Sequence, residues 1–281
     1  MANVDMTGRV CLVTGATAGI GLATARALAA MNATLIVHGR DAVKARATAE
    51  SLRAAIGDEQ VDWVIGDFAS LADVRKLAAE LHERTDHLHV LVNNAGAMFP
   101  AFRTSVDGFE LTMAVNHLAP FLLTNLLLDI LKASAPARVV NVSSGAHRRF
   151  PLNFGDLESR NDYEVWAVYS RSKLMNILFT RELARRLAGT AVTVNALSPG
   201  LVHTEFGVKD GMGPEQQELM NRGDAPEHGA RTSIYLATSA EVEGATGGYH
   251  SNAAPAEVAD IAKDESMDAR LWEISAKMVG L

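Results

Sequence analysis

The sequence has a single cysteine in 281 residues, which excludes an internal disulfide. Cys11 stands in an apolar run, and we expect it to be a small buried residue in a reducing compartment. Long uninterrupted apolar runs are also missing, because the stretch HLAPFLLTNLLLDIL contains Pro120, Thr124, Asn125 and Asp129. The first ten residues lack a basic segment followed by an apolar one, as a signal peptide would have. We therefore expect a soluble cytoplasmic protein without a membrane anchor.

Basic runs, repeats and linkers are absent as well. The net charge is −7, and no segment is dominated by lysine and arginine, so nucleic acid is not an expected partner. His82, His87 and His89 stand close together, but no cysteine or helical pairing accompanies them, and we expect a surface turn and no metal site. Without a proline- or serine-rich linker, residues 1–281 are expected to form one domain.

Short apolar runs alternate with longer helical patterns along the chain. The expected strands are residues 9–15, 34–40, 61–67, 89–96, 137–144 and 191–200. The expected helices are residues 19–31, 42–56, 71–84, 109–134 and a segment that includes 168–183. Nearly continuous apolar strands are typical of buried parallel sheets. We predict an α/β, doubly wound Rossmann fold with a parallel sheet of about seven strands and helices on both faces.

A glycine-rich stretch, TGATAGIG, lies between the first expected strand and the first expected helix. Gly15, Gly19 and Gly21 allow the backbone to turn sharply and approach a pyrophosphate, which the N–H groups of the helix N-terminus would bind. The alternative is a tight turn without a ligand.

Four polar residues follow expected strands: Arg40, Asp67, Asn94 and Ser144. Ligands of open α/β sheets lie beyond the carboxyl ends of the strands, so these side chains indicate a site there. Asp67 is placed to accept a hydrogen bond from an adenine amino group, or else to cap the helix that starts near Leu71.

The end of the second expected strand bears on cofactor choice. Gly39 occupies the position where a carboxylate would bind the ribose hydroxyls of NAD, and Arg40 follows it. Arginine binds phosphate through paired, charge-assisted hydrogen bonds. Asp41 is expected to cap the next helix. The pattern favours NADP(H) over NAD(H).

Tyr169 and Lys173 are four residues apart in an expected helix, so their side chains are neighbours. We expect the lysine ammonium to favour the phenolate and lower the pKa of Tyr169 toward neutrality, which would make it a usable acid or base. The alternative is a solvated helix face.

Together these features resemble the short-chain dehydrogenase/reductase family. The motifs are TGATAGIG (14–21), NNAG (93–96), Asn116, NVSS (141–144), YSRSK (169–173) and SPGLVHT (198–204), in the family's order over almost the whole chain. Their TGxxxGxG spacing fits single-domain members rather than the sugar-nucleotide epimerase branch. Segments such as VVNVSSGAH and SKLMNILFTRELARRL are most similar to retinol dehydrogenases and WW-domain-containing oxidoreductases.

The resemblance implies catalytic roles for Asn116, Ser144, Tyr169 and Lys173. Tyr169 would exchange a proton with the substrate oxygen, Ser144 would hold that oxygen, and Asn116 would position a water in a relay to Lys173. Ser143 remains an alternative to Ser144, and Asn116 could bond only its local backbone. The expected cofactor-binding residues are Gly15, Thr17, Ala18, Gly19, Ile20, Gly21, Arg40, Asp67, Phe68, Asn94, Ala95, Gly96, Tyr169, Lys173, Pro199, Gly200, Val202 and Thr204.

The leading hypothesis is an NADP(H)-dependent carbonyl reductase or alcohol dehydrogenase with a small, largely apolar substrate. A non-catalytic NADP-binding regulator is the alternative, and the glycine spacing and length disfavour an epimerase or dehydratase. Residues 205–228 are a candidate substrate lid. His147, Arg148 and Arg149 are expected in a solvated loop, with the mouth of the substrate site as the alternative. The resemblance also implies a homodimer or homotetramer.

Overall fold

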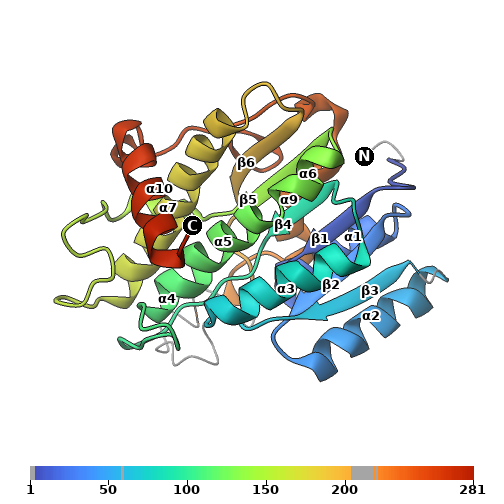
Figure 1. The fold of residues 1–281 in the computed structure, drawn as a ribbon, viewed down its shortest axis with the longest axis horizontal. Helices are drawn as coiled ribbons and strands as arrows, with labels where there is room; N and C mark the ends of the chain where they lie inside the picture. Colours follow the sequence, from blue (N-terminus) through green and yellow to red (C-terminus); the bar gives the residue numbers. More distant parts are fainter. Residues whose placement is uncertain (1–3, 58–59, 204–217, 219–220) are drawn as a thin grey trace.

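A parallel sheet lies at the centre of the protein (Figure 1). A computed structural model describes residues 4–57, 60–203, 218 and 221–281, and within them the sheet has eight strands in the order β3-β2-β1-β4-β5-β6-β7-β8. The strands are β1 (Val10–Val13), β2 (Thr34–Gly39), β3 (Val61–Ile65), β4 (Val90–Asn93), β5 (Ala137–Val142), β6 (Val192–Ser198), β7 (Tyr249–Ser251) and β8 (Ala254–Pro255).

This sheet confirms the predicted fold. The six strands expected from apolar runs are all present, and each is shorter than expected because its polar end belongs to the loop beyond the sheet. Every neighbouring pair is parallel except β7 and β8. These last two strands are three and two residues long, too short to produce a recognisable apolar pattern.

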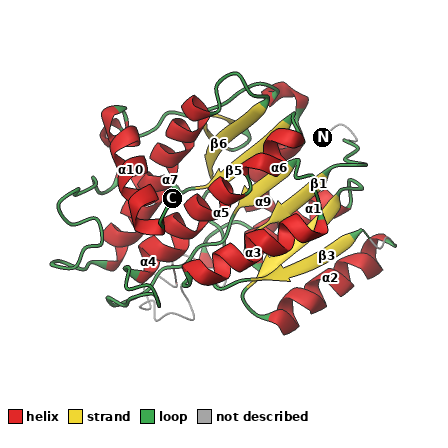
Figure 2. Cartoon of the chain, viewed as in Figure 1, coloured by secondary structure: helices red, strands yellow, loops and turns green. Residues whose placement is uncertain are grey.

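Helices cover both faces of the sheet (Figure 2). They are α1 (Gly19–Ala29), α2 (Ala42–Ile56), α3 (Leu71–Arg84), α4 (Leu111–Met113), α5 (Ala119–Leu126), α6 (Leu128–Ala133), α7 (Val165–Arg186), α9 (Pro226–Thr238) and α10 (Ser266–Val279). One buried apolar cluster joins the sheet to α1, α2 and α9, and a second joins it to α3, α5, α7 and α10. Cys11 is fully buried in the first cluster, as expected.

Side-chain caps explain where two helices begin. The carboxylate of Asp41 accepts a hydrogen bond from the backbone of Lys44 at 3.1 Å, which confirms the predicted cap of α2. Ser70, not Asp67, caps α3 by accepting from the backbone of Asp73. The capping alternative for Asp67 is therefore wrong.

The single helix expected over residues 109–134 is broken, and this expectation was wrong. A π-helix over Ala114–Leu118 separates α4 from α5, and α6 follows separately. Proline has no N–H, and its ring crowds the carbonyl four residues earlier. For Pro120 that carbonyl belongs to Asn116. The backbone N–H of Ala119 instead bonds the carbonyl of Ala114 five residues back, which widens the helix at Asn116.

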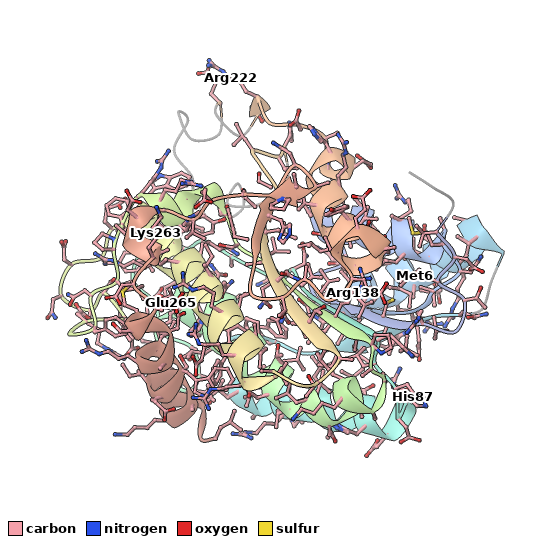
Figure 3. The ribbon with its side chains drawn as sticks, turned by 90° about the horizontal axis from the view of Figure 1, so that it is seen from above. Met6, His87, Arg138, Arg222, Lys263 and Glu265 are labelled. Atoms are coloured by element: carbon pink, nitrogen blue, oxygen red, sulfur yellow. The ribbon has the colours of Figure 1, made fainter. Side chains whose placement is uncertain are left out.

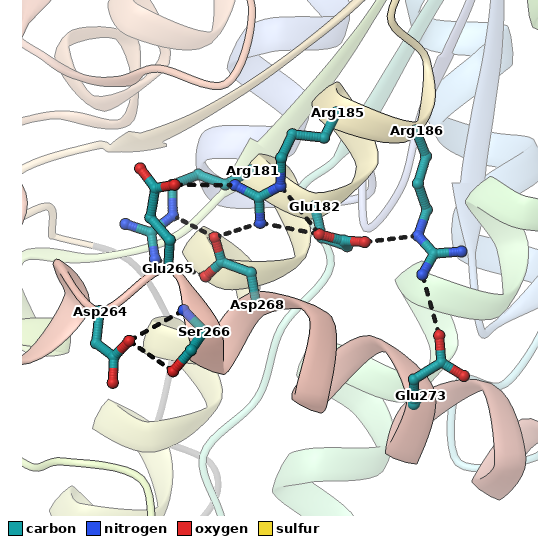
Figure 4. Close-up of polar contacts among 9 residues, drawn as sticks. All are labelled: Arg181, Glu182, Arg185, Arg186, Asp264, Glu265, Ser266, Asp268 and Glu273. Carbon is teal, nitrogen blue, oxygen red and sulfur yellow. Dashed lines mark hydrogen bonds and ion pairs between the residues drawn. The ribbon is translucent and has the colours of Figure 1, made fainter.

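Charged side chains fasten α10 to α7 (Figure 4). Asp268 is completely buried, and its carboxylate pairs with Arg181 at 2.6 Å and with Arg185 at 2.7 Å. One turn further along α10, Trp272 packs edge-on against Phe121 of α5 at a ring distance of 4.8 Å. The C-terminal helix is therefore held by both charge and packing.

Another arginine ties a helix end to the sheet. Arg138 of β5 donates to the carbonyls of Leu236 and Ser239, at 3.0 and 2.8 Å. Viewed from above, Arg138 lies beside α9, the helix whose end it holds (Figure 3). None of the described helices is both long and apolar enough to span a membrane.

Replacement of Asp268 by alanine should lower the free energy of unfolding by about 3 kcal/mol. Removing one partner of a buried ion pair leaves the other charge without a partner. Urea denaturation followed by circular dichroism measures this loss. Glu50→Ala is the control, since its pair with Arg46 is more than half exposed on both sides and contributes less than about 1 kcal/mol. Equal losses in the two variants would contradict the role of the α7–α10 network.

Candidate active site

The glycine-rich loop has no room for side chains at two positions. A Cβ added to Gly21 would lie 2.3 Å from the carbonyl oxygen of Gly15, and one added to Gly15 would lie 2.9 Å from the Cα of Ala95. Gly15 and Gly19 also have positive φ angles of 63° and 55°. Ala18 precedes α1 and offers no side-chain cap, so the first N–H groups of this helix suit an anion.

The side chain of Asn94 braces this loop. Its amide nitrogen donates to the carbonyls of Thr14 and Gly15, at 2.8 and 3.2 Å. In return, the hydroxyl of Thr14 accepts from the backbone N–H groups of Asn94 and Ala95, at 2.9 and 3.0 Å. The sequence reasoning did not single out Thr14, although it immediately precedes Gly15. Together the two residues hold the ends of β1 and β4 against each other.

A buried histidine supports the same loop from β2. His38 Nδ1 accepts from the backbone of Gly15 at 3.3 Å, and its Nε2 lies 3.1 Å from the carbonyl of Gly66. Burial lowers the pKa of His38 to about 4. Phe68 stacks on its ring at 4.6 Å, so this side chain is part of the support. Asp67 is exposed, and one of its oxygens accepts from Ala69 in a local turn.

The four expected catalytic residues meet beyond the carboxyl ends of β4 and β5. The side chains of Ser144 and Tyr169 are hydrogen-bonded to each other, and the Lys173 ammonium lies 5.6 Å from the centre of the Tyr169 ring. A Cβ added to Gly96 would lie 3.3 Å from Lys173 Nζ and 3.4 Å from Asn116 Oδ1. The Lys173 amine and the Asn116 amide therefore approach each other at Gly96.

Ser143 and Ser144 have different surroundings. The Ser143 hydroxyl is buried and donates to the carbonyl of Lys173 at 2.7 Å, so it fastens β5 to α7. The Ser144 side chain is half-buried next to Tyr169. Between the two serines, the structure brings Ser144 to the tyrosine.

Asn116 bonds distant parts of the chain rather than its own helix. Its amide oxygen accepts from the backbone of Ala97 at 2.7 Å, and its amide nitrogen donates to the carbonyl of Ala97 at 2.9 Å and to the hydroxyl of Ser172 at 3.0 Å. The reading of Asn116 as a locally bonded residue is therefore wrong. Ser172, one residue before Lys173, was not identified from the sequence. These contacts link the loop after β4 to α7.

Burial changes the pKa of both side chains on α7 that are expected to be catalytic. It lowers the pKa of Lys173 to about 8, although the amine donates to the carbonyl of Val142 at 3.1 Å. It also raises the pKa of Tyr169 to about 12, and the Ser144 hydrogen bond only partly opposes the rise. The expectation that Lys173 brings the pKa of Tyr169 toward neutrality is wrong in this structure. Desolvation of the phenol raises its pKa and keeps Tyr169 protonated at neutral pH.

The SPGLVHT segment follows β6. Gly200 has a φ of 83°, and its N–H and that of Gly145 both donate to the Ser198 hydroxyl, at 3.3 and 3.1 Å. The turn that holds Pro199 and Gly200 is thus joined to the turn after Ser144. Val202 is buried against Gly229. Thr204 lies outside the described residues, as does most of the candidate lid, and residues 226–228 of that lid form the first turn of α9.

Cations gather near the glycine-rich loop at the end of β2. Arg40 is exposed, and within the described part of the chain it has no ion-pair partner. An open surface hollow of about 280 Å³ between α1 and α2 is lined by Thr17, Arg26 and Lys44, among others. Lys44 was not identified from the sequence, although it follows Arg40 by four residues. The glycine-rich loop and the uncapped helix fit the pyrophosphate of a nicotinamide dinucleotide, and these cations lie beside them.

His147 is not in a solvated loop, so that expectation was wrong for this residue. It is completely buried, whereas Arg148 and Arg149 are exposed. Arg148 donates to the carbonyl of Glu257, and Arg149 lies 5.8 Å from the ring centre of Trp166. The sequence around His147 has no apolar periodicity that would have distinguished a buried histidine from an exposed one.

The buried amine makes stability depend on pH in a definite direction. Between pH 8 and 10.5 the folded protein has lost the Lys173 proton while the unfolded chain keeps it, so stability rises with pH across this window. Relative to a Lys173→Met variant, the parent should gain up to about 3 kcal/mol of unfolding free energy between pH 7 and 10.

Urea denaturation at both pH values measures this difference. Lys76→Met is the control, because the Lys76 side chain is 82% exposed and its removal should leave the pH dependence unchanged. If the free energies of unfolding of the parent and of Lys173→Met change equally between the two pH values, burial does not lower the pKa of Lys173.

Comparisons with known proteins agree with this geometry. The family model for short chain dehydrogenases matches residues 9–213. Human retinol dehydrogenase 14 is 45% identical, with 98% of this chain and 88% of that protein covered, and human retinol dehydrogenase 13 is 42% identical, with 100% and 87% covered. A solved uncharacterized protein from Mycobacterium paratuberculosis has a TM-score of 0.81 at 33% identity, with 99% and 95% covered. A Pseudomonas aeruginosa RhlG/NADP active-site complex has a TM-score of 0.71 at 31% identity, with 88% and 95% covered. The chain belongs to the short-chain dehydrogenase family and is an oxidoreductase.

Proposed function

We propose that this protein interconverts an apolar carbonyl compound and its alcohol with NADP(H), using Tyr169 as the acid and base. The observation that carries the proposal is the convergence of four side chains: Ser144 bonds Tyr169, Lys173 lies beside the Tyr169 ring, and Asn116 meets Lys173 at Gly96. The alternative, a regulator that binds NADP without catalysis, does not require a proton donor at this position.

The nicotinamide cofactor supplies a hydride when bound. The chain must then hold the carbonyl oxygen and provide one proton. Ser144 and Tyr169 present hydrogen-bonded hydroxyls at the same place, and both are partly exposed. With its pKa raised by burial, Tyr169 carries the proton needed for reduction. The Lys173 amine lies close enough to stabilise the phenolate that remains after the proton leaves.

The surroundings of Tyr169 favour an apolar substrate. Trp166 lies one turn earlier on α7, with its ring 6.2 Å from that of Tyr169. Tyr163 donates to the carbonyl of Phe99, which brings further aromatic groups close to the loop after β4. Relatives named retinol dehydrogenases cover nearly the whole chain, so an apolar aldehyde such as retinal is the first substrate to test.

The end of β2 supports NADP(H) over NAD(H). A Cβ added to Gly39 would lie 2.6 Å from the Thr17 methyl carbon, so a ribose-binding carboxylate has no space there unless Thr17 moves. Asp41, the other nearby carboxylate, is engaged as the cap of α2. Arg40 and Lys44 provide two cations for the additional phosphate of NADP. A structural relative, described as RhlG, was solved in complex with NADP.

Tyr169→Phe should lower kcat about a hundredfold or more while the dissociation constant of NADPH stays within about twofold, because the ring remains and the acid is lost. The assay follows NADPH absorbance with retinal, nonanal and benzaldehyde, and fluorescence titration measures cofactor binding. Tyr235→Phe on α9 is the control for loss of a tyrosine hydroxyl elsewhere. A parent that oxidises NADPH with none of a wider carbonyl panel would favour the regulator instead.

Arg40→Ala should remove most of the preference for NADPH over NADH. A charge-assisted hydrogen bond to phosphate contributes about 1.5–3 kcal/mol, which corresponds to roughly ten- to a hundredfold in affinity. Titration of both cofactors at fixed salt measures the effect, and Lys44→Ala should give a smaller loss. Arg46→Ala removes an exposed charge from the same region and should leave discrimination unchanged. A parent that prefers NADH would refute the cofactor assignment.

A further inference from the structure

The carbonyl of Ser144 and a distant backbone N–H are joined by one buried imidazole. His147 Nδ1 lies 2.7 Å from the carbonyl oxygen of Ser144, and the backbone N–H of Ala259 donates to His147 Nε2 at 3.1 Å. Ala259 precedes a short 3₁₀ turn over Asp260–Ala262, far along the chain from Ser144. The ring of Tyr249 packs edge-on against the imidazole at 5.0 Å.

These two partners determine the protonation of His147. A carbonyl only accepts and a backbone N–H only donates, so Nδ1 must carry a proton and Nε2 must be bare. The ring is therefore neutral and has one tautomer. Its complete burial agrees with a neutral ring, since a buried imidazolium without a carboxylate partner is costly.

The carbonyl that His147 bonds is that of Ser144, whose side chain bonds Tyr169. Ser144 begins the 3₁₀ turn Gly145–Arg148, and its hydroxyl accepts from the backbone of Ala146 at 3.1 Å while it also bonds Tyr169. On the other side, the next N–H, of Gly145, donates to the Ser198 hydroxyl at 3.1 Å. The Ser144 carbonyl also accepts from the backbone N–H of His147 at 3.2 Å. Of these contacts at Ser144, the one made by the His147 imidazole reaches the C-terminal segment.

We propose that His147 is a positioning residue of the active site, which orients Ser144 toward Tyr169 through its Nδ1–H bond to the Ser144 carbonyl. This proposal rests on the proposed carbonyl reductase function. It gives the C-terminal segment around Ala259 a role in catalysis, because the accepting nitrogen of His147 is anchored there. Histidine suits this position because its ring donates from Nδ1 on one side and accepts at Nε2 on the other.

Two amide variants separate the two contacts. The amide nitrogen of asparagine can replace Nδ1 and restore the bond to Ser144, whereas the amide oxygen of glutamine can replace Nε2 and restore only the bond to Ala259. His147→Gln should lower kcat about tenfold or more with KM and the NADPH dissociation constant little changed, because small displacements of positioned groups are costly in catalysis. His147→Asn should recover most of the lost kcat.

Two further measurements keep the result unambiguous. His147→Gln should have no additional effect on kcat in a Ser144→Ala background, because both changes then act through the same hydroxyl. Thermal unfolding of each variant shows whether lost activity follows lost stability. Recovery by glutamine instead of asparagine, or fully additive losses with Ser144→Ala, would overturn the proposal and leave His147 a structural residue.

Ring-nitrogen NMR of histidine-labelled protein tests the proposal without any substrate. The His147 signals are identified by their loss in His147→Asn, and they should show a protonated Nδ1 and a bare Nε2 at neutral pH. An Nε2-protonated or doubly protonated ring would overturn the proposal whatever the turnover. Absence of turnover in the parent, in contrast, would refute the proposed function while the NMR result still decides the state of His147.

Discussion

The cost of burying the Lys173 amine is the constraint around which the site is organised. Only 3% of this residue is exposed, and its pKa falls to about 8 because the charged form has lost its water. The amine bonds the carbonyl of Val142 at the end of β5, and the backbone carbonyl of Lys173 receives the Ser143 hydroxyl. These two bonds hold α7 against β5, and the same contact brings Tyr169 to Ser144. In the proposed reaction, the cation at this place stabilises the phenolate of Tyr169, which gives the buried lysine a use that offsets its cost.

The candidate site also depends on the close approach of the backbone after β1 to the backbone after β4, at the carboxyl end of the sheet. Gly15 and Gly21 let the loops after β1 and β4 touch, and Thr14 and Asn94 lock them together. Pro120 widens the helix at Asn116, so that this side chain reaches Ala97 and Ser172. Pro120 interrupts an apolar helix, and this interruption places the Asn116 amide in the candidate active site.

The C-terminal part of the chain supports a site to which it contributes no expected catalytic residue. Asp268 and Trp272 fix α10 to α7 and α5. Ser275 of α10 lies 2.8 Å from His117 Nε2, next to Asn116 in the π-helix, and Ala259 bonds His147 near Ser144. Both histidines are buried and have lowered pKa values. Each one connects a segment of the candidate active site to a region more than a hundred residues further along the chain.

The sequence alone was sufficient for strands β1 to β6, helices α1 to α3, the position of the glycine-rich loop and the Tyr169–Lys173 pair, because apolar periodicity, glycine spacing and helical neighbours are local properties. Strands β7 and β8 are too short to show such a pattern. It was not sufficient for the acidity of Tyr169, since desolvation depends on every segment packed around the phenol. Burial of His147, the break at Asn116 and the cap at Ser70 were also missed. For His147 and Asn116 the deciding partners are residues far away in sequence, and only the tertiary structure brings them within hydrogen-bonding distance.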